Sequence, residues 1–167
     1  LGKGNGWGLF MIESKNQNKL VGCSHCVQQL WEIDLIKNTS RHIGKSGPGG
    51  GQINAMAWDK NKEELFLASY STCSLMKFKP GVDALPTLMV TLKHNQIRPL
   101  GMKLYQRELW MITLAKLGNR GGALSCYHID KNELTYFMDI LEEQSPQSIL
   151  LDAEKEVLYL SLSIYPE

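Results

Sequence analysis

Two cysteines and a histidine near the N-terminus have the spacing of metal ligands. Cys23, His25 and Cys26 offer two thiols and an imidazole within four residues. A closed zinc site needs a fourth ligand, however, and such sites usually contain a second pair with similar spacing. Cys73 and Cys126 fall near the same strand-turn-strand place in later parts of the chain. We therefore favour the interpretation that these cysteines are small, partly buried hairpin residues, and keep Cys23 and Cys26 as candidate metal ligands in the alternative.

Two aspartates follow apolar runs that are typical of β-strands. Asp59 comes directly after residues 53–58, and Asp152 comes directly after residues 148–151. A carboxylate in this place can accept hydrogen bonds from the amides of a tight turn, which is the interpretation we favour. The alternative is that Asp59 and Asp152 bind a divalent cation through their carboxylate oxygens.

One glycine-rich stretch partly matches a phosphate-binding loop. Gly44, Lys45 and Ser46 have the order of its last three residues, but Thr39 replaces the first glycine of the pattern. The motif must also open a helix, whose N-terminal amides hold the phosphates. Residues 47–51 consist of four glycines and one proline, so we expect a flexible connector at this point and no bound cofactor.

Three further histidines are scattered along the chain. His42, His94 and His128 have no carboxylate or nucleophile in local register with them. We therefore expect exposed or hydrogen-bonded strand histidines and no catalytic residue.

A loop at residues 116–122 is the longest insertion between two strongly predicted strands. Loops on a rigid scaffold often carry recognition residues. Asn119 and Arg120 are therefore candidate contacts for a partner, with a simple hairpin tip as the alternative.

Short strands carry all of these residues. Apolar or alternating runs are separated by polar turns, and we find no stripe with the 3.6-residue period of an amphipathic helix. The predicted strands are 6–12, 19–24, 27–35 and 39–43; 53–58, 65–70, 74–79 and 87–92; 100–104, 109–114, 123–129 and 134–140; and 148–151 and 157–163. The sequence thus predicts an all-β protein of four units, at about 6–45, 52–94, 97–143 and 146–167, the last incomplete.

The four units repeat one another along the chain. Matching places on the second strand of each unit are occupied by Leu20, Phe66, Trp110 and Tyr159. The intervals between these markers are 46, 44 and 49 residues. A period of about 40 to 50 residues with four short strands per unit is typical of β-propeller blades. We expect the aromatic markers to lie in the core between neighbouring blades.

With this repeat, the chain resembles the β-propeller superfamily, and within it the WD-repeat proteins and related propellers. The resemblance lies in residues 53–59 followed by 64–69, and in residues 146–152 followed by 157–161. It departs from the WD-repeat pattern because Trp58-Asp59 closes a first strand rather than a third one. The resemblance implies a β-propeller domain over residues 1–167, with about three and a half four-stranded blades of a larger ring.

The incomplete ring implies a need for further blades. A single blade exposes both faces, and stacking blades around an axis buries them. Because complete propellers usually have 4 to 8 blades, we expect the remaining ones to come from the same parent chain or, less favoured, from another subunit.

The composition argues against nucleic acid and membranes as partners of this chain. With 18 basic and 17 acidic residues, the chain has no strong field to attract nucleic acid or anionic lipid, and no apolar run approaches the roughly 18 residues that a membrane span needs. Sparse cysteines favour an intracellular, cytoplasmic setting.

We expect a protein-interaction scaffold in a larger assembly rather than an enzyme. The alternative is part of a hydrolytic propeller, of the lactonase or esterase kind, with a central divalent metal.

Overall fold

The computed structural model describes residues 6–13, 18–24, 29–45, 47, 51–119, 121–142 and 144–164. All regular secondary structure in these ranges is β-strand, which confirms the predicted all-β class. The chain forms two compact units, Leu1–Thr91 and Leu92–Glu167. In the described ranges, no helix has the length and apolar character that crossing a bilayer requires.

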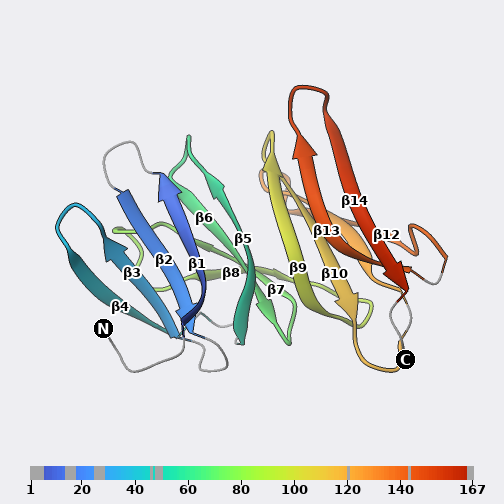
Figure 1. Cartoon of the computed structure of the whole chain (residues 1–167), viewed down its shortest axis with the longest axis horizontal. Helices are drawn as coiled ribbons and strands as arrows, with labels where there is room; N and C mark the ends of the chain where they lie inside the picture. The colour runs from blue at the N-terminus through green and yellow to red at the C-terminus, as the bar shows by residue number, and fades with distance from the viewer. Residues whose placement is uncertain are drawn as a thin grey trace. The chain divides into compact units, whose positions relative to one another are not determined.

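The first unit contains two antiparallel sheets, each with four strands in sequential order (Figure 1). One sheet consists of β1 (Gly6–Glu13), β2 (Asn18–Ser24), β3 (Gln29–Asp34) and β4 (Thr39–Lys45). The other consists of β5 (Gln52–Asp59), β6 (Glu64–Tyr70), β7 (Ser74–Phe78) and β8 (Thr87–Thr91). Buried side chains from both sheets form one core, with Val21, Leu30, Ile43, Ile53, Leu67, Met76 and Phe78 among its members.

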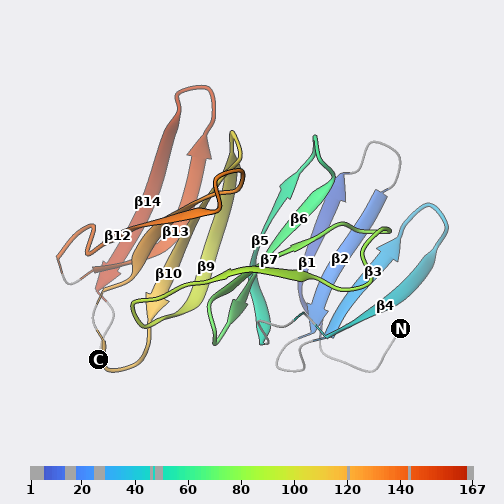
Figure 2. The same ribbon diagram turned by 180° about the vertical axis from the view of Figure 1, so that it is seen from behind.

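The second unit contains one four-stranded sheet and one hairpin. The sheet consists of β9 (Gln96–Tyr105), β10 (Glu108–Ala115), β11 (Ala123–His128) and β12 (Glu133–Met138), and the hairpin of β13 (Gln144–Asp152) and β14 (Val157–Ile164). Strand β13 packs against β9 and β10, and Figure 2 shows the same strands from behind. The contact is tight at Gly101, where an added Cβ would lie 2.8 Å from Cγ2 of Ile149.

The same β-bulge interrupts the first strand of every sheet. The residue without a partner on the second strand is Gly8, Asn54, Leu100 or Gln147, and β9 has a second bulge at Ile97. The four repeated positions are 46, 46 and 47 residues apart. The bulge therefore repeats almost evenly, as expected of copies of one structural unit.

The bulges also align the four sequence markers. The residue three places after each of the four repeated bulges pairs with the marker, as Met11–Leu20, Ala57–Phe66, Lys103–Trp110 and Leu150–Tyr159. The predicted equivalence of the markers is thus confirmed. Their uneven spacing arises partly in the turns, because two residues join β9 to β10 whereas four join β5 to β6.

The prediction that the aromatic markers are core residues holds only for Phe66, which is fully buried. Trp110 is half-buried and stacks on Phe137, with ring centroids 6.0 Å apart. Tyr159 is 48% exposed, so the prediction was wrong there. The reason is its position on the face of the hairpin opposite Ile149, where no described sheet covers it.

Candidate functional sites

Asp59 and Asp152 are turn residues. Oδ1 of Asp59 accepts hydrogen bonds from the backbone amides of Asn61 and Lys62, at 2.9 and 3.0 Å. Oδ1 of Asp152 accepts one from the amide of Lys155 at 3.1 Å. The favoured interpretation of both aspartates is therefore confirmed. Neither belongs to a group of three possible metal ligands among the described residues.

A third aspartate has the same role and was missed in the sequence. Oδ1 of Asp34, at the end of β3, accepts hydrogen bonds from the amides of Lys37 and Ile36, at 2.9 and 3.1 Å. The amide of Lys37 is the main reason why the pKa of Asp34 lies below its usual value. The turn then closes through Asn38, whose φ of 52° is left-handed.

The N-terminal thiol pair is only partly described. Cys23 is buried on β2, and burial raises the pKa of its thiol. Cys26 lies outside the described residues, so a shared metal site for Cys23 and Cys26 stays a prediction.

The predicted interaction loop has internal hydrogen bonds. Nδ2 of Asn119 donates to the carbonyl oxygen of Lys116 at 3.2 Å, and its Oδ1 accepts from Nδ2 of Asn95 at 3.1 Å. Leu117, in the same turn, is 92% exposed. Arg120 lies outside the described residues, and the role of this loop in binding stays a prediction.

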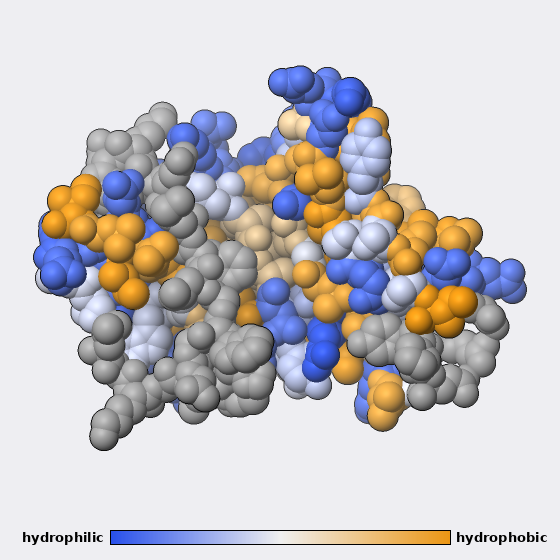
Figure 3. All heavy atoms as spheres, viewed as in Figure 1, coloured by the Kyte–Doolittle hydropathy of each residue, from blue (hydrophilic) through white to orange (hydrophobic). Residues whose placement is uncertain are grey.

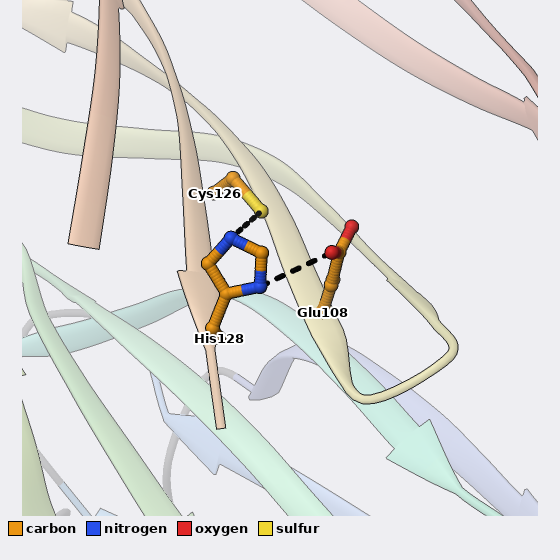
Figure 4. A group of neighbouring side chains, drawn as sticks. All are labelled: Glu108, Cys126 and His128. Atoms are coloured by element: carbon orange, nitrogen blue, oxygen red, sulfur yellow. Dashed lines mark hydrogen bonds and ion pairs between the residues drawn. The ribbon is translucent and has the colours of Figure 1, made fainter. Parts of the chain in front are cut away.

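One group of possible metal ligands exists within the described part of the chain, and the sequence did not reveal it. It consists of Glu108, Cys126 and His128, whose ligand atoms all lie within 4.8 Å of one another (Figure 4). In the antiparallel pairing of β10 with β11, Glu108 lies opposite His128 and Trp110 opposite Cys126. Paired residues share a face of the sheet, and so do residues two apart on one strand. The register therefore brings the three side chains together.

The imidazole of His128 lies between the other two groups. Its Nδ1 is 3.1 Å from Oε1 of Glu108, and its Nε2 is 3.9 Å from Sγ of Cys126. Oε2 of Glu108 accepts a hydrogen bond from Nε1 of Trp110 at 3.1 Å, which holds the carboxylate in place. We expected an exposed or hydrogen-bonded strand histidine, and His128 is hydrogen-bonded on β11. Its carboxylate partner Glu108 is not local in the sequence but lies opposite it on the neighbouring strand β10.

The order carboxylate, imidazole, thiol is also that of a cysteine nucleophile with its base. Such a nucleophile must be exposed and easily deprotonated. Cys126 is only 2% exposed. Burial, assisted by the charge of Glu108, raises the pKa of its thiol to about 12. At neutral pH the group is a protonated thiol, which makes it a poor nucleophile.

The hairpin β13–β14 exposes an apolar face, here called the outer hairpin face. It consists of Leu150, Val157 and Tyr159, of which Leu150 and Tyr159 are a cross-strand pair. Their exposed fractions are 60%, 39% and 48%. Figure 3 shows hydrophobic residues along this hairpin, below its charged turn. The opposite face carries Ile149, which is buried near Gly101.

Comparison with known proteins identifies the fold. No family model and no curated protein sequence matches the chain. Among solved structures, it is similar to the β-propeller domain of Cps50 (Swd1) from Myceliophteria thermophila, with a TM-score of 0.66 and 10% identity over 97% of this chain and 50% of that one. It is also similar to a luciferin-regenerating enzyme, with a TM-score of 0.60 and 13% identity over 97% of this chain and 61% of that one.

A third similar structure is a nidogen/laminin complex, with a TM-score of 0.52 and 11% identity over 71% of this chain and 42% of that chain. The chain thus spans between 42% and 61% of these three structures. The similarity to the WD-repeat class is structural only, because the identity to Swd1 is 10%. Four-stranded antiparallel sheets in sequential order, repeated along the chain, agree with these matches. The chain has the β-propeller fold.

Proposed function

We propose that this chain is a segment of a β-propeller that acts as a protein-interaction scaffold, and that the hairpin β13–β14 is the surface at which the remaining blades join it. The observation that carries the proposal is the combination of the apolar outer hairpin face with the uncharged strand β14. Both features belong to a surface that another polypeptide covers.

Strand β14 has the character of an edge that pairs with another strand. Its sequence, VLYLSLSI, contains no charge, proline or glycine, and no described strand pairs with its far side. Exposed apolar edges of this kind bind further strands, and proteins usually block them with charges, bulges or short strands. Two other outer strands show such devices: β4 contains Arg41 and Lys45, and β8 has only five residues.

The occupant that fits best is a pair of antiparallel strands from the polypeptide that carries the remaining blades. The other three sheets have four strands each, whereas this one has two. Two more strands beside β14 would make the β13–β14 sheet four-stranded like the others, and a further blade would cover Leu150, Val157 and Tyr159. The similarity to about half of a propeller domain supports this assignment. The same parent chain is the favoured source, and another subunit is the alternative.

A hydrolytic propeller with a central divalent metal is the weaker alternative. Its support is the structural similarity to a luciferin-regenerating enzyme, which extends to the fold alone. The two carboxylates suggested for such a site, Asp59 and Asp152, accept hydrogen bonds from turn amides instead.

The test is the association state of the purified 167-residue chain. We expect a concentration-dependent mass above the monomer value of 18.8 kDa, measured by light scattering after gel filtration, because the exposed hairpin binds other copies in the absence of its partner. Replacing Leu150→Lys and Tyr159→Lys together should restore the monomer. Leu117→Lys is the matched control, since Leu117 is exposed but lies in a loop.

A wild-type chain that is a stable monomer at all concentrations would refute the proposal. So would association that Leu117→Lys removes as well as the hairpin double variant does, because the contact would then lie elsewhere.

A further inference from the structure

We propose that Glu108, Cys126 and His128 form a binding site for a transition-metal ion of the Zn²⁺ type, with one coordination position left open. The inference is independent of the interaction scaffold proposed above. It concerns a single sheet, and all three residues lie on the paired strands β10 and β11.

The three ligand atoms, one from each residue, lie within 4.8 Å of one another, which is somewhat wider than a tetrahedral site needs. Zinc lies about 2.3 Å from a cysteine sulfur and about 2.0 to 2.1 Å from nitrogen or oxygen ligands, which places neighbouring ligand atoms about 3.3 to 3.6 Å apart. The distances here are 3.1 Å from histidine to glutamate and 3.9 Å from histidine to cysteine. These two contacts use different ring nitrogens. A turn of the side chain of His128 or Glu108, each about 30% exposed, would bring one nitrogen to the metal.

The donor set favours zinc over the hard cations. Thiolate and imidazole ligands select zinc and similar transition metals, whereas Mg²⁺ and Ca²⁺ prefer oxygen alone. Three protein ligands are the usual number where a fourth position holds water or another molecule. The indole of Trp110 donates to Oε2 of Glu108 and leaves Oε1 free to face the histidine. Hydrogen bonds of this kind orient the ligands of known metal sites.

Binding must release the proton of the thiol. The reaction is Cys–SH plus Zn²⁺ giving Cys–S⁻–Zn²⁺ plus H⁺, so affinity should rise with pH.

The register also places Lys103 of β9 opposite Trp110 and Glu133 of β12 opposite His128, on the same face. From the hairpin, Glu156 accepts a hydrogen bond from the hydroxyl of Tyr105. Beside the site itself, the carboxylates of Glu108 and Glu133 outnumber the one ammonium group of Lys103, a balance that favours a cation.

The experiment is a titration of the full 167-residue chain with Co²⁺, which replaces Zn²⁺ and absorbs in the near ultraviolet when a thiolate binds it. We expect this absorption in the wild type and its loss when Zn²⁺ is added. Cys126→Ser should abolish it. His128→Gln and Glu108→Gln should each weaken Co²⁺ binding by at least about tenfold, since loss of an outer-shell partner alone costs about 10- to 100-fold. Calorimetry in two buffers should show about one proton released per ion.

Two cysteine variants are the controls. Cys73→Ser removes a buried thiol of the other unit, and Cys26→Ser removes the alternative N-terminal ligand. Both should bind Co²⁺ as the wild type does.

Absence of thiolate absorption in the wild type would overturn the proposal, and so would its persistence in Cys126→Ser or its loss in Cys26→Ser. If Cys126→Ser does not fold, as judged by circular dichroism, the variants at the two partly exposed ligands decide. Unchanged affinity in both would overturn the proposal, and weakened affinity in both would support it.

Discussion

The contact between β9 and β13 can be tested by adding one methyl group. Gly101→Ala would place a Cβ 2.8 Å from Cγ2 of Ile149, and 3.6 and 3.7 Å from Cγ1 and Cδ1 of Ile112. Carbon atoms pack favourably at about 3.5 to 4.0 Å. The contacts with Ile112 are therefore acceptable, but the hairpin must move away by roughly 0.7 Å or more at Ile149.

The expected loss in stability is roughly 0 to 2.5 kcal/mol, centred near about 1 kcal/mol. Overpacking by one methyl group costs about 1 to 3 kcal/mol, and the replacement of glycine by alanine within a strand recovers about 0.5 to 1 kcal/mol. The backbone should adopt alanine without strain, because Gly101 is not among the residues with positive φ. The steric term should therefore exceed the gain.

Urea unfolding followed by circular dichroism measures the change in the free energy of unfolding. Because blades can open separately, hydrogen exchange of the β13 and β14 amides should locate the loss in the hairpin. Ile149→Ala leaves a cavity and costs about 2 to 5 kcal/mol. The double variant Gly101→Ala/Ile149→Ala should lose less than the sum of the two single losses, since the new methyl group occupies part of that space.

Additive losses in the double variant would refute the proposed contact. A Gly101→Ala chain that is more stable than the wild type, with unchanged exchange in the hairpin, would also show that β9 and β13 do not pack at this point.

Two further predictions concern the turns. Asp59→Ala should lower the free energy of unfolding by about 1 to 2 kcal/mol, because it removes the acceptor of two amide hydrogen bonds. Asp152→Ala removes the acceptor of one such bond at a more exposed site, so its loss should be smaller. Equal urea midpoints for the two variants would contradict this ranking. The pKa of Asp34 is lower in the folded chain than its usual value. The stability that Asp34 contributes to the fold is therefore complete at a pH above its unfolded-state pKa, and it disappears as the pH falls through its folded-state pKa. Unfolding measured from about pH 5 down to about pH 2.5 should thus have a shallower acid slope in Asp34→Asn than in the wild type, and identical slopes would exclude this role.

Much of the fold could be predicted because short strands with polar turns leave a local signal. The two least accurate strands were the first strands of the last two units. Their predicted ranges were 100–104 and 148–151, whereas β9 is Gln96–Tyr105 and β13 is Gln144–Asp152. In both, the missed segment lies at or before a bulge and contains a proline, Pro99 or Pro146. A bulge breaks the alternation on which the prediction depends.

The group of Glu108, Cys126 and His128 could not be predicted for a different reason. Glu108 and Cys126 are far apart in sequence, and only the register of β10 against β11 joins them. That register depends on the length of the intervening loop and on long-range pairing, which local patterns do not report. The turn role of Asp59, by contrast, depends on amides two and three residues away, and so was accessible from the sequence.

The repeated bulge has a consequence for how these units tolerate deletions. Removing a residue from a regular strand shifts the pairing of everything beyond it and moves those side chains to the opposite face. At Asn54 the flanking residues Ile53 and Ala55 already pair with consecutive residues, Ser69 and Ala68. Loss of Asn54 would therefore leave the pairing on both sides intact. Each first strand thus contains at least one position where evolution can change the length of the chain without changing its register.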